Sequence, residues 1–387
     1  MSDTHYDLIV VGGGIHGLMI GLHATERGLR TLLLDKGDIG GAATAGWFGI
    51  LHGGLRYLQS LDIRRFRASL SDSRWFLRRY PDLVECQSFL MPLYGHGLKR
   101  PGTFRAAFLM ERALGADRNR AIPPGKALRR GRILRPSEVR TDAPGVPRDN
   151  LQGGALWEEL VVSDHAALID SILRDARAAG LEVRPQTPAS DLLLKDGQVA
   201  GVATKSVRFL APRVINAAGA WAPALAHRFD PASQIPFGFP VRAFNLLLDR
   251  PPPSTHGLSL GTGDPAEGML FLRPFQGRTF AGTGYLGHVD TADSVETPPE
   301  AITDFLARID RALPGFDATA STVLAVSSGL LPGPQRGGTA LVDRDVIHDH
   351  ASSGGPKGLV SVWGVKYTTA PSVARHALTL ARGDHQA

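Results

Sequence analysis

The chain has 387 residues, a length that suits about two domains at roughly 150 residues per domain. Its single cysteine, Cys86, excludes an internal disulfide and a cysteine-based metal cluster, so we predict no metal site. The net charge is +6, residues 1–6 lack a signal-peptide pattern, and no apolar run reaches the about 18 residues of a membrane span, so we expect a cytoplasmic protein.

The chain begins with the pattern of a βαβ unit. Residues 6–11 form an apolar run, residues 15–27 have apolar positions at helical spacing, and residues 31–34 form a second apolar run. A glycine turn separates the first strand from the helix, and Asp35 closes the second strand. We therefore expect a strand, a helix and a parallel strand joined by a right-handed crossover.

The turn in this unit carries the spacing Gly-x-Gly-x-x-Gly at Gly12, Gly14 and Gly17. A pyrophosphate must approach the backbone closely at a helix N-terminus, where free N–H groups and the helix dipole attract negative charge. Side chains at these positions would block that approach. Asp35 is placed to accept hydrogen bonds from the ribose hydroxyls. The motif predicts dinucleotide binding and leaves open whether the dinucleotide is NAD or FAD.

Positive charge gathers in residues 99–140, where twelve lysines and arginines face three acids, a balance of +9 in a chain of +6. Such a segment can attract an anionic membrane, nucleic acid or an anionic substrate, or it can be a solvated surface. We expect no nucleic-acid binding because the segment lacks a recognisable binding motif. Phe104, Phe108 and Leu109 give the predicted helix at 101–115 an apolar side, which predicts peripheral, salt-sensitive contact with the inner face of an anionic membrane.

The elements expected after the first unit alternate along the chain. They are helices at 64–79, 101–115 and 166–179, loops at 121–150, a hairpin at 192–203, strands at 214–215, 239–249, 269–280 and 359–363, and a helix at 368–382. Because the last strand and helix repeat the opening βα pattern, we expect a cofactor domain assembled from separated segments, with a second domain inserted. We assign residues 1–85, 150–225 and 320–387 to the cofactor domain, and residues 86–149 and 226–319 to the substrate domain.

Three further strings resemble a known family. They are His52-Gly53-Gly54-Leu55-Arg56-Tyr57-Leu58, Asn216-Ala217-Ala218-Gly219 and Trp363-Gly364-Val365-Lys366-Tyr367-Thr368-Thr369. Over essentially the whole chain, the sequence resembles the FAD-dependent glycerol-3-phosphate dehydrogenase family of D-amino-acid-oxidase-like flavoenzymes. The resemblance implies an α/β fold, with an FAD-binding Rossmann-like domain and an inserted substrate domain that contains an antiparallel sheet. Larger members add a helical C-terminal domain, which we expect this chain to lack.

The resemblance also implies roles for individual residues. FAD contacts are expected from Gly12, Gly14, Gly17, Asp35, Thr44, Gly53, Gly219, Gly364, Val365 and Lys366. Catalytic roles fall to His52, Arg56 and Lys366, and substrate binding to Arg56, Tyr57, Asn245, Arg344 and Lys366. His52 and Lys366 are the candidate bases, although a histidine here could equally support the loop. Arg56 and Arg344 could instead form surface ion pairs.

The sequence departs from the family at the substrate. Leu331 stands where the family has an arginine, Asn245 where it usually has a histidine, and Gly49 where it has a lysine; Trp47 and Phe48 replace small hydroxyl residues. These losses leave FAD binding intact and weaken the case for glycerol 3-phosphate itself.

We therefore expect oxidation of a secondary alcohol, in a polyol phosphate or related hydroxylated anion, by hydride transfer to flavin N5. A quinone, another acceptor or oxygen would take the electrons. One alternative is an FAD-dependent oxidase of amino acids, amines or 2-hydroxy acids, in which a basic residue binds a carboxylate. The other is a flavin-binding protein whose active site has decayed.

Overall fold

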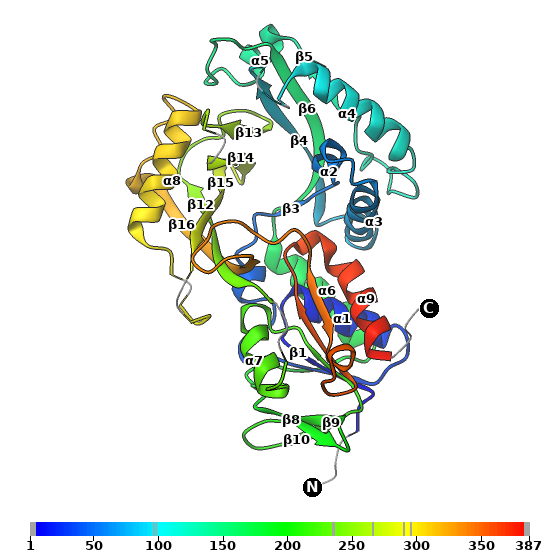
Figure 1. Cartoon of the computed structure of the whole chain (residues 1–387). Coiled ribbons are helices and arrows are strands. Elements are labelled where there is room, and N and C mark those ends of the chain that lie inside the picture. The colour runs from blue at the N-terminus through cyan, green and yellow to red at the C-terminus, as the bar shows by residue number, and fades with distance from the viewer. Residues whose placement is uncertain are drawn as a thin grey trace.

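The computed structural model describes residues 5–95, 97, 99–233, 237–264, 267–288, 291–294 and 296–382. Figure 1 shows these residues in two bodies, a lower one around β1, α1 and α9 and an upper one around β4, β6 and β12–β16. Both termini lie at the lower body. The chain crosses between the bodies more than once, because strands of the upper sheet lie between β2 and β7 and between β11 and β17 in the sequence.

The lower body contains a six-stranded sheet in the order β17-β18-β11-β1-β2-β7. These strands are β17 (Val346–Asp349), β18 (Leu359–Trp363), β11 (Val214–Asn216), β1 (Leu8–Val11), β2 (Thr31–Leu34) and β7 (Glu182–Arg184). All neighbours pair in parallel except β17, which is antiparallel to β18. The central strands are buried along their whole length and mostly apolar because both faces of the sheet are covered.

Helices α1 (Ile15–Thr25), α6 (His165–Ala178) and α9 (Ala370–Arg382) pack together beside this sheet, and their buried side chains join those of β1 and β18 in one core. Helix α7 (Ala222–Phe229) packs on β18, and a small sheet of β8 (Asp191–Lys195), β9 (Gln198–Ala203) and β10 (Arg208–Leu210) lies at the lower end. The opening βαβ unit and the β8–β9 hairpin are confirmed as predicted.

The upper body contains a nine-stranded sheet in the order β16-β12-β15-β14-β13-β4-β6-β3, with β5 also paired to β6. Its strands are β16 (Val323–Gly333), β12 (Phe239–Leu248), β15 (Arg278–Gly287), β14 (Met269–Phe275), β13 (Gly257–Gly261), β4 (Val84–Leu93), β6 (Gly153–Val162), β3 (Ile50–Leu51) and β5 (Arg132–Leu134). Pairing is antiparallel except between β13 and β4. The expected antiparallel sheet is present. Three of its strands, β3, β6 and β16, come from ranges that the sequence analysis gave to the cofactor domain, and the domain boundaries stay a prediction.

Helices cover the upper sheet at its ends. They are α2 (Leu55–Gln59), α3 (Ile63–Arg79), α4 (Pro101–Leu114), α5 (Pro136–Asp142) and α8 (Pro299–Ala312). The expected loop at 121–150 was partly wrong, because it contains β5 and α5. The single strand expected at 269–280 is two strands, because Gln276 and Gly277 form a turn with positive φ angles of 51° and 76°.

The apolar side of α4 faces the protein. Phe104 and Phe108 are only 2% and 8% exposed and pack with Leu93 and Ala155, whereas Leu109 is 67% exposed. The interpretation of α4 as an interfacial membrane helix was therefore wrong, since its two aromatic side chains already stabilise the upper body. No helix within the described ranges is long and apolar enough to cross a membrane.

Candidate active site

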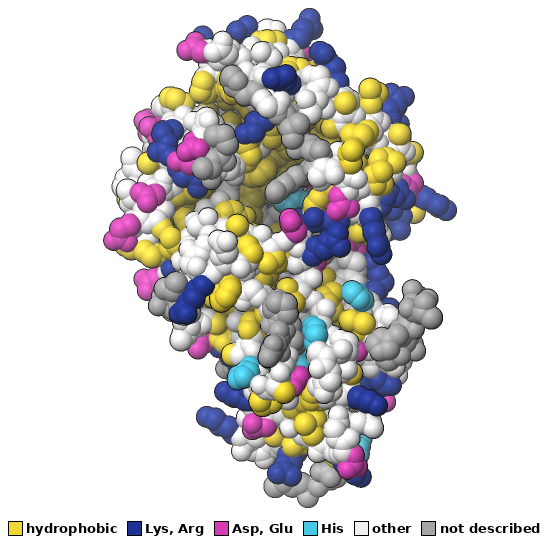
Figure 2. Space-filling model, in the orientation of Figure 1, with side chains coloured by type: hydrophobic (Ala, Val, Ile, Leu, Met, Phe, Trp, Pro, Cys, Tyr) yellow, Lys and Arg dark blue, Asp and Glu magenta, His cyan; other side chains and the backbone are white. Residues whose placement is uncertain are grey.

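One large cavity joins the two bodies. Its volume is about 2290 Å³, and its walls include Gly12, Asp35, Thr44, Tyr57 and Lys366. In Figure 2 the hollow opens in the upper half of the molecule and is lined largely by hydrophobic side chains. The cavity exceeds the about 300–1,000 Å³ of an ordinary ligand pocket, as a site for both a dinucleotide and a substrate requires.

The glycine turn at one end of the cavity has no room for side chains. Gly12 has a φ of 107°, and a Cβ there would lie 2.4 Å from the Ala217 carbonyl oxygen. A Cβ on Gly17 would lie 1.8 Å from the Gly12 carbonyl oxygen. The close approach of β1, α1 and β11 therefore demands glycine at both positions, and it leaves the first turn of α1 facing the cavity.

Asp35 and Thr44 lie beside this turn. Asp35 accepts hydrogen bonds from the backbone N–H groups of Gly13 and Gly37, the latter at 2.7 Å. Thr44 belongs to the short helix η1 (Ala42–Thr44), and its Oγ1 accepts a hydrogen bond from the Ile15 N–H at 3.0 Å. Both side chains line the cavity at the N-terminus of α1, where the sequence analysis expected the ADP half of the cofactor.

The segment between β18 and α9 reaches the same cavity beside the glycine turn, because β1, β11 and β18 are parallel and end at the same edge of the sheet. Gly364, Val365 and Lys366 line it, and a Cβ on Gly364 would lie 2.0 Å from the His16 ring. The Val365 N–H donates to Asp345 Oδ1 at 2.7 Å. Burial lowers the pKa of His16, and its Nε2 is buried without a hydrogen-bond partner among the described residues. Sequence reasoning missed His16, although it lies inside the Gly-x-Gly-x-x-Gly string.

Tyr57 and Lys366 meet in the cavity. The Lys366 ammonium donates a hydrogen bond to the Tyr57 hydroxyl and lies 4.5 Å from the centre of its ring. The Arg65 guanidinium lies 4.4 Å from the same ring centre and also donates to the Asp343 carbonyl. The Lys366 ammonium and the Tyr57 phenol thus join the segment before α9 to helix α2, and both residues line the cavity.

His52 and Gly53 lie at the start of the turn into α2. The His52 N–H donates to Thr368 Oγ1 at 3.1 Å, and the exposed His52 side chain lines the cavity. The Gly53 N–H donates to Glu159 Oε2 at 2.6 Å. Glu159 also accepts from Trp157 Nε1 at 3.1 Å, and burial raises its pKa to about 7. No sequence signal identified Glu159, because the residue lies in an unremarkable strand, β6.

Asn245 is 2% exposed at the wall of the cavity. Its Nδ2 donates to the Gly46 carbonyl at 2.8 Å, and its Oδ1 accepts from Thr283 Oγ1 at 3.0 Å. The side chain thus links β12 to β15 and to the segment after η1. An amide suits this position because it donates and accepts at once.

Aromatic side chains form part of the wall. Trp47 stacks on Tyr367 with ring centres 3.7 Å apart, and Phe48 stacks on Phe280 at 5.0 Å. Behind Phe48 lies Arg273, which is fully buried, donates to the Phe48 carbonyl at 3.1 Å, and has its pKa lowered to about 10 by burial. Sequence reasoning missed this arginine.

Of the remaining predicted residues, some line the cavity and others do not or lie outside what is described. Gly14 and Gly219 line the cavity, and Leu331 lines it as well. Arg344 is exposed and is not among the described residues that line the cavity. The side chain of Arg56, in α2, lies outside the described residues.

The parallel sheet, the glycine turn and the connected cavity define a dinucleotide-binding enzyme with a second, substrate-facing sheet. The profile of the family "FAD dependent oxidoreductase" matches residues 7–379, and the chain belongs to this family. It is therefore an FAD-dependent oxidoreductase, and the glycine turn, Asp35 and the wide cavity fit that cofactor.

Several individual proteins resemble this chain in sequence or in fold. The chain is 33% identical to glycerol-3-phosphate dehydrogenase 1 of Mycobacterium tuberculosis, over 97% of this chain and 73% of that protein. It superposes on the FAD-complexed glycerol-3-phosphate dehydrogenase of Bacillus halodurans with a TM-score of 0.74 and 22% identity, over 99% of this chain and 66% of that one. It superposes on glycine oxidase from Geobacillus kaustophilus with a TM-score of 0.72 and 18% identity, over 99% and 96% of the two chains. The two structural matches show the fold alone.

Proposed function

We propose that the enzyme oxidises the secondary alcohol of a small anionic substrate, a polyol phosphate of the glycerol-3-phosphate type. The observation that carries the proposal is the Lys366–Tyr57 pair at the end of the cavity that begins at the glycine turn. The 33% identity to a glycerol-3-phosphate dehydrogenase supports the substrate class. When bound, FAD supplies the two-electron acceptor that no side chain of the protein can provide.

We assign the chemical roles by protonation state. Lys366 donates to the Tyr57 hydroxyl, so its ammonium and this hydroxyl together hold the oxygen atoms of the substrate. An ammonium has no lone pair, whereas a neutral imidazole has one, so His52 is the residue that we propose to accept the hydroxyl proton. Arg56, four residues after His52 in the sequence, would neutralise the substrate anion.

The fate of the electrons is part of the proposal. A membrane quinone, another acceptor or oxygen could oxidise the flavin, and contact with an anionic membrane would have to rest on charge and on exposed side chains such as Leu109. The buried Phe104 and Phe108 contribute nothing to such contact. Flotation with anionic vesicles at low and high salt would test it.

The decisive experiment is anaerobic bleaching of the flavin absorbance by a panel of compounds. We expect glycerol 3-phosphate or a related polyol phosphate to bleach it faster than hydroxy acids or amino acids. Faster bleaching by a 2-amino acid would favour the alternative function, an oxidase of amino acids. The fold of this chain resembles that of glycine oxidase over 99% of its length. A flavin that dithionite reduces but no compound in the panel bleaches would favour a decayed site.

Leu331→Arg offers a gain-of-function test at the cavity wall. The resemblance places a substrate-binding arginine of the family at this position, so we expect the variant to lower the KM for a phosphate substrate about tenfold or more, typical of a charge-assisted hydrogen bond. The matched control is Leu331→Met, which keeps the side chain apolar. An equal KM in both variants would place the phosphate elsewhere in the cavity.

A further inference from the structure

A second, smaller pocket lies on the outer side of α3. Its volume is about 240 Å³, and it is lined by Ser71, Arg74, Trp75, Arg78, Arg79 and Arg375. Four of these six residues are arginines and none is acidic, which is an unusual composition for a concave surface. In Figure 2, Lys and Arg side chains gather along the side of the molecule where α3 lies.

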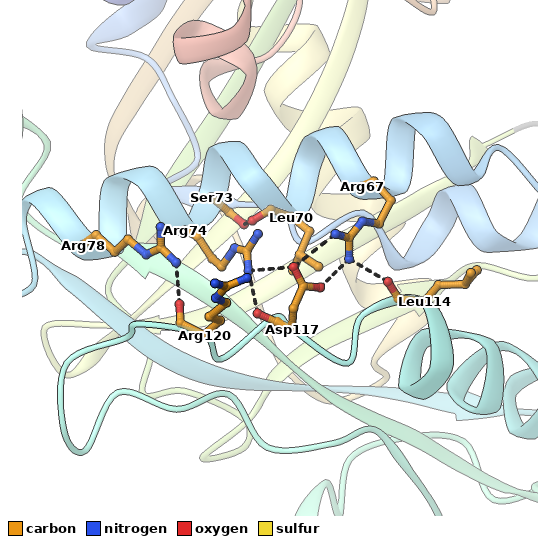
Figure 3. Close-up of polar contacts among 8 residues, drawn as sticks. All are labelled: Arg67, Leu70, Ser73, Arg74, Arg78, Leu114, Asp117 and Arg120. Carbon is orange, nitrogen blue, oxygen red and sulfur yellow. Dashed lines mark hydrogen bonds and ion pairs between the residues drawn. The ribbon is translucent and has the colours of Figure 1, made fainter.

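The guanidinium groups of Arg74 and Arg78, on one wall of the pocket, are only partly paired with carboxylates. Arg74 Nη1 lies 3.2 Å from Asp117 Oδ2, but Arg67 binds the same carboxylate through both of its terminal nitrogens. Arg78 donates to the backbone carbonyl of Arg120, which leaves its charge in place (Figure 3). These contacts fix two guanidinium groups, those of Arg67 and Arg74, around one carboxylate and a third, that of Arg78, at a backbone carbonyl.

The opposite wall is held by acids that lie behind the arginines. Arg79 binds Asp175 at 2.8 Å and Glu26 at 3.0 Å. Arg375, from α9, binds Asp72 at 3.1 Å, and burial raises the pKa of Asp72 to about 6. The acids therefore orient these guanidinium groups from outside the pocket and do not enter it.

A neighbouring side chain, that of His23, lies within reach of the charges of the same arginines. His23 is 8% exposed, and burial is the first cause that lowers its pKa to about 4. The other causes are the charges of Arg375, Arg27 and Arg79. On the pocket side, Arg74 Nε is buried without a hydrogen-bond partner among the described residues.

We propose that this pocket binds the phosphate groups of a small soluble polyphosphate compound. The volume of about 240 Å³ corresponds to about eight water molecules at about 30 Å³ each, which suits two or three linked phosphates. Guanidinium forks match phosphate oxygens in charge and geometry, and Ser71 adds a hydroxyl donor. Because the walls come from α3 and α9, an occupant would hold α9 against α3.

Binding of tripolyphosphate to the FAD-loaded protein, measured by calorimetry, tests this proposal. We expect the affinity to fall at least tenfold in the double variant Arg78→Gln/Arg375→Gln, with flavin content unchanged. Arg64→Gln is the matched control, because Arg64 is an exposed arginine of the same helix that does not line the pocket. Its affinity should stay within twofold of the unchanged protein. If the double variant fails to fold, Arg78→Gln alone serves, since Arg78 is held by only a backbone carbonyl.

Two results would overturn the proposal. One is absence of tripolyphosphate binding at low salt, or an equal loss in Arg64→Gln and the double variant, which would indicate diffuse attraction to a basic surface. The other is binding to phosphatidylglycerol vesicles, lost in the double variant, without binding of tripolyphosphate. That result would make a lipid headgroup the source of the phosphate.

Discussion

Gly17→Ala tests the geometry of the cofactor turn directly. The new Cβ would lie 1.8 Å from the Gly12 carbonyl oxygen, whereas real Cβ contacts essentially never fall below 3.0 Å. Helix α1 must therefore move by about 1.2 Å relative to β1, the difference between those two distances. Overpacking of this kind costs about 1–3 kcal/mol or more, and the displaced turn can no longer receive a pyrophosphate.

The two costs can be separated. Without added FAD, we expect the free energy of unfolding to fall by about 1–3 kcal/mol. With FAD at about a hundred times its Kd, the unchanged protein gains about 2.7 kcal/mol from binding, and the variant loses this gain. Urea unfolding with and without FAD measures both.

Gly102→Ala is the control, because nothing lies within 4 Å of the new Cβ and the position is in a helix. It should raise stability by up to about 1 kcal/mol. A Gly17→Ala protein that binds FAD with unchanged Kd and unfolds like the unchanged protein would refute the reasoning.

Three further predictions concern charge. Lys366→Met should slow the reduction of bound flavin by about 10² or more, and Arg56→Ala should do the same at unchanged flavin content, as stopped-flow measurements normalised to bound flavin would show. Because the pKa values of His23 and His165 are lowered to about 4, stability should be full above pH 6.5 and fall as the pH drops toward 4, by several kcal/mol in urea titrations. The pKa of Glu159 is raised to about 7, so its contribution is full below pH 4.5 and lost as the pH rises through 7, and Glu159→Gln should remove about 3 kcal/mol of that dependence.

The cofactor turn could be predicted because its determinants are local. A strand, three glycines, a helix and a closing acid lie within the first 35 residues, and each restricts the backbone of its neighbours. The same holds for the β8–β9 hairpin, where Asp196 and Gly197 form the turn with positive φ angles of 52° and 72°.

The substrate side could not be predicted in the same way, because its contacts join distant residues. Glu159 bonds Gly53 across 106 positions, and Lys366 bonds Tyr57 across 309. The resemblance supplied Lys366 and Tyr57 as residues, but only the fold brings them into contact. Helix α4 is a second case in which the sequence leaves the contact partner open. A helix with a periodic apolar side has the same sequence pattern whether that side contacts lipid or a sheet. In this structure it contacts β4 and β6.

Two of the three positions that lack a basic residue of the family, Gly49 and Asn245, have a structural reason for it. A side chain at Gly49 would meet Arg273 Nη2 at 2.6 Å, and the φ of 86° favours glycine there, so a lysine at this position is excluded by the packing around Arg273. Asn245 uses both ends of its amide to join β12, β15 and the segment at Gly46. Nothing in the structure explains Leu331. Because Leu331 lines the cavity, Leu331→Arg is the substitution that tests whether the missing positive charge matters for an anionic substrate.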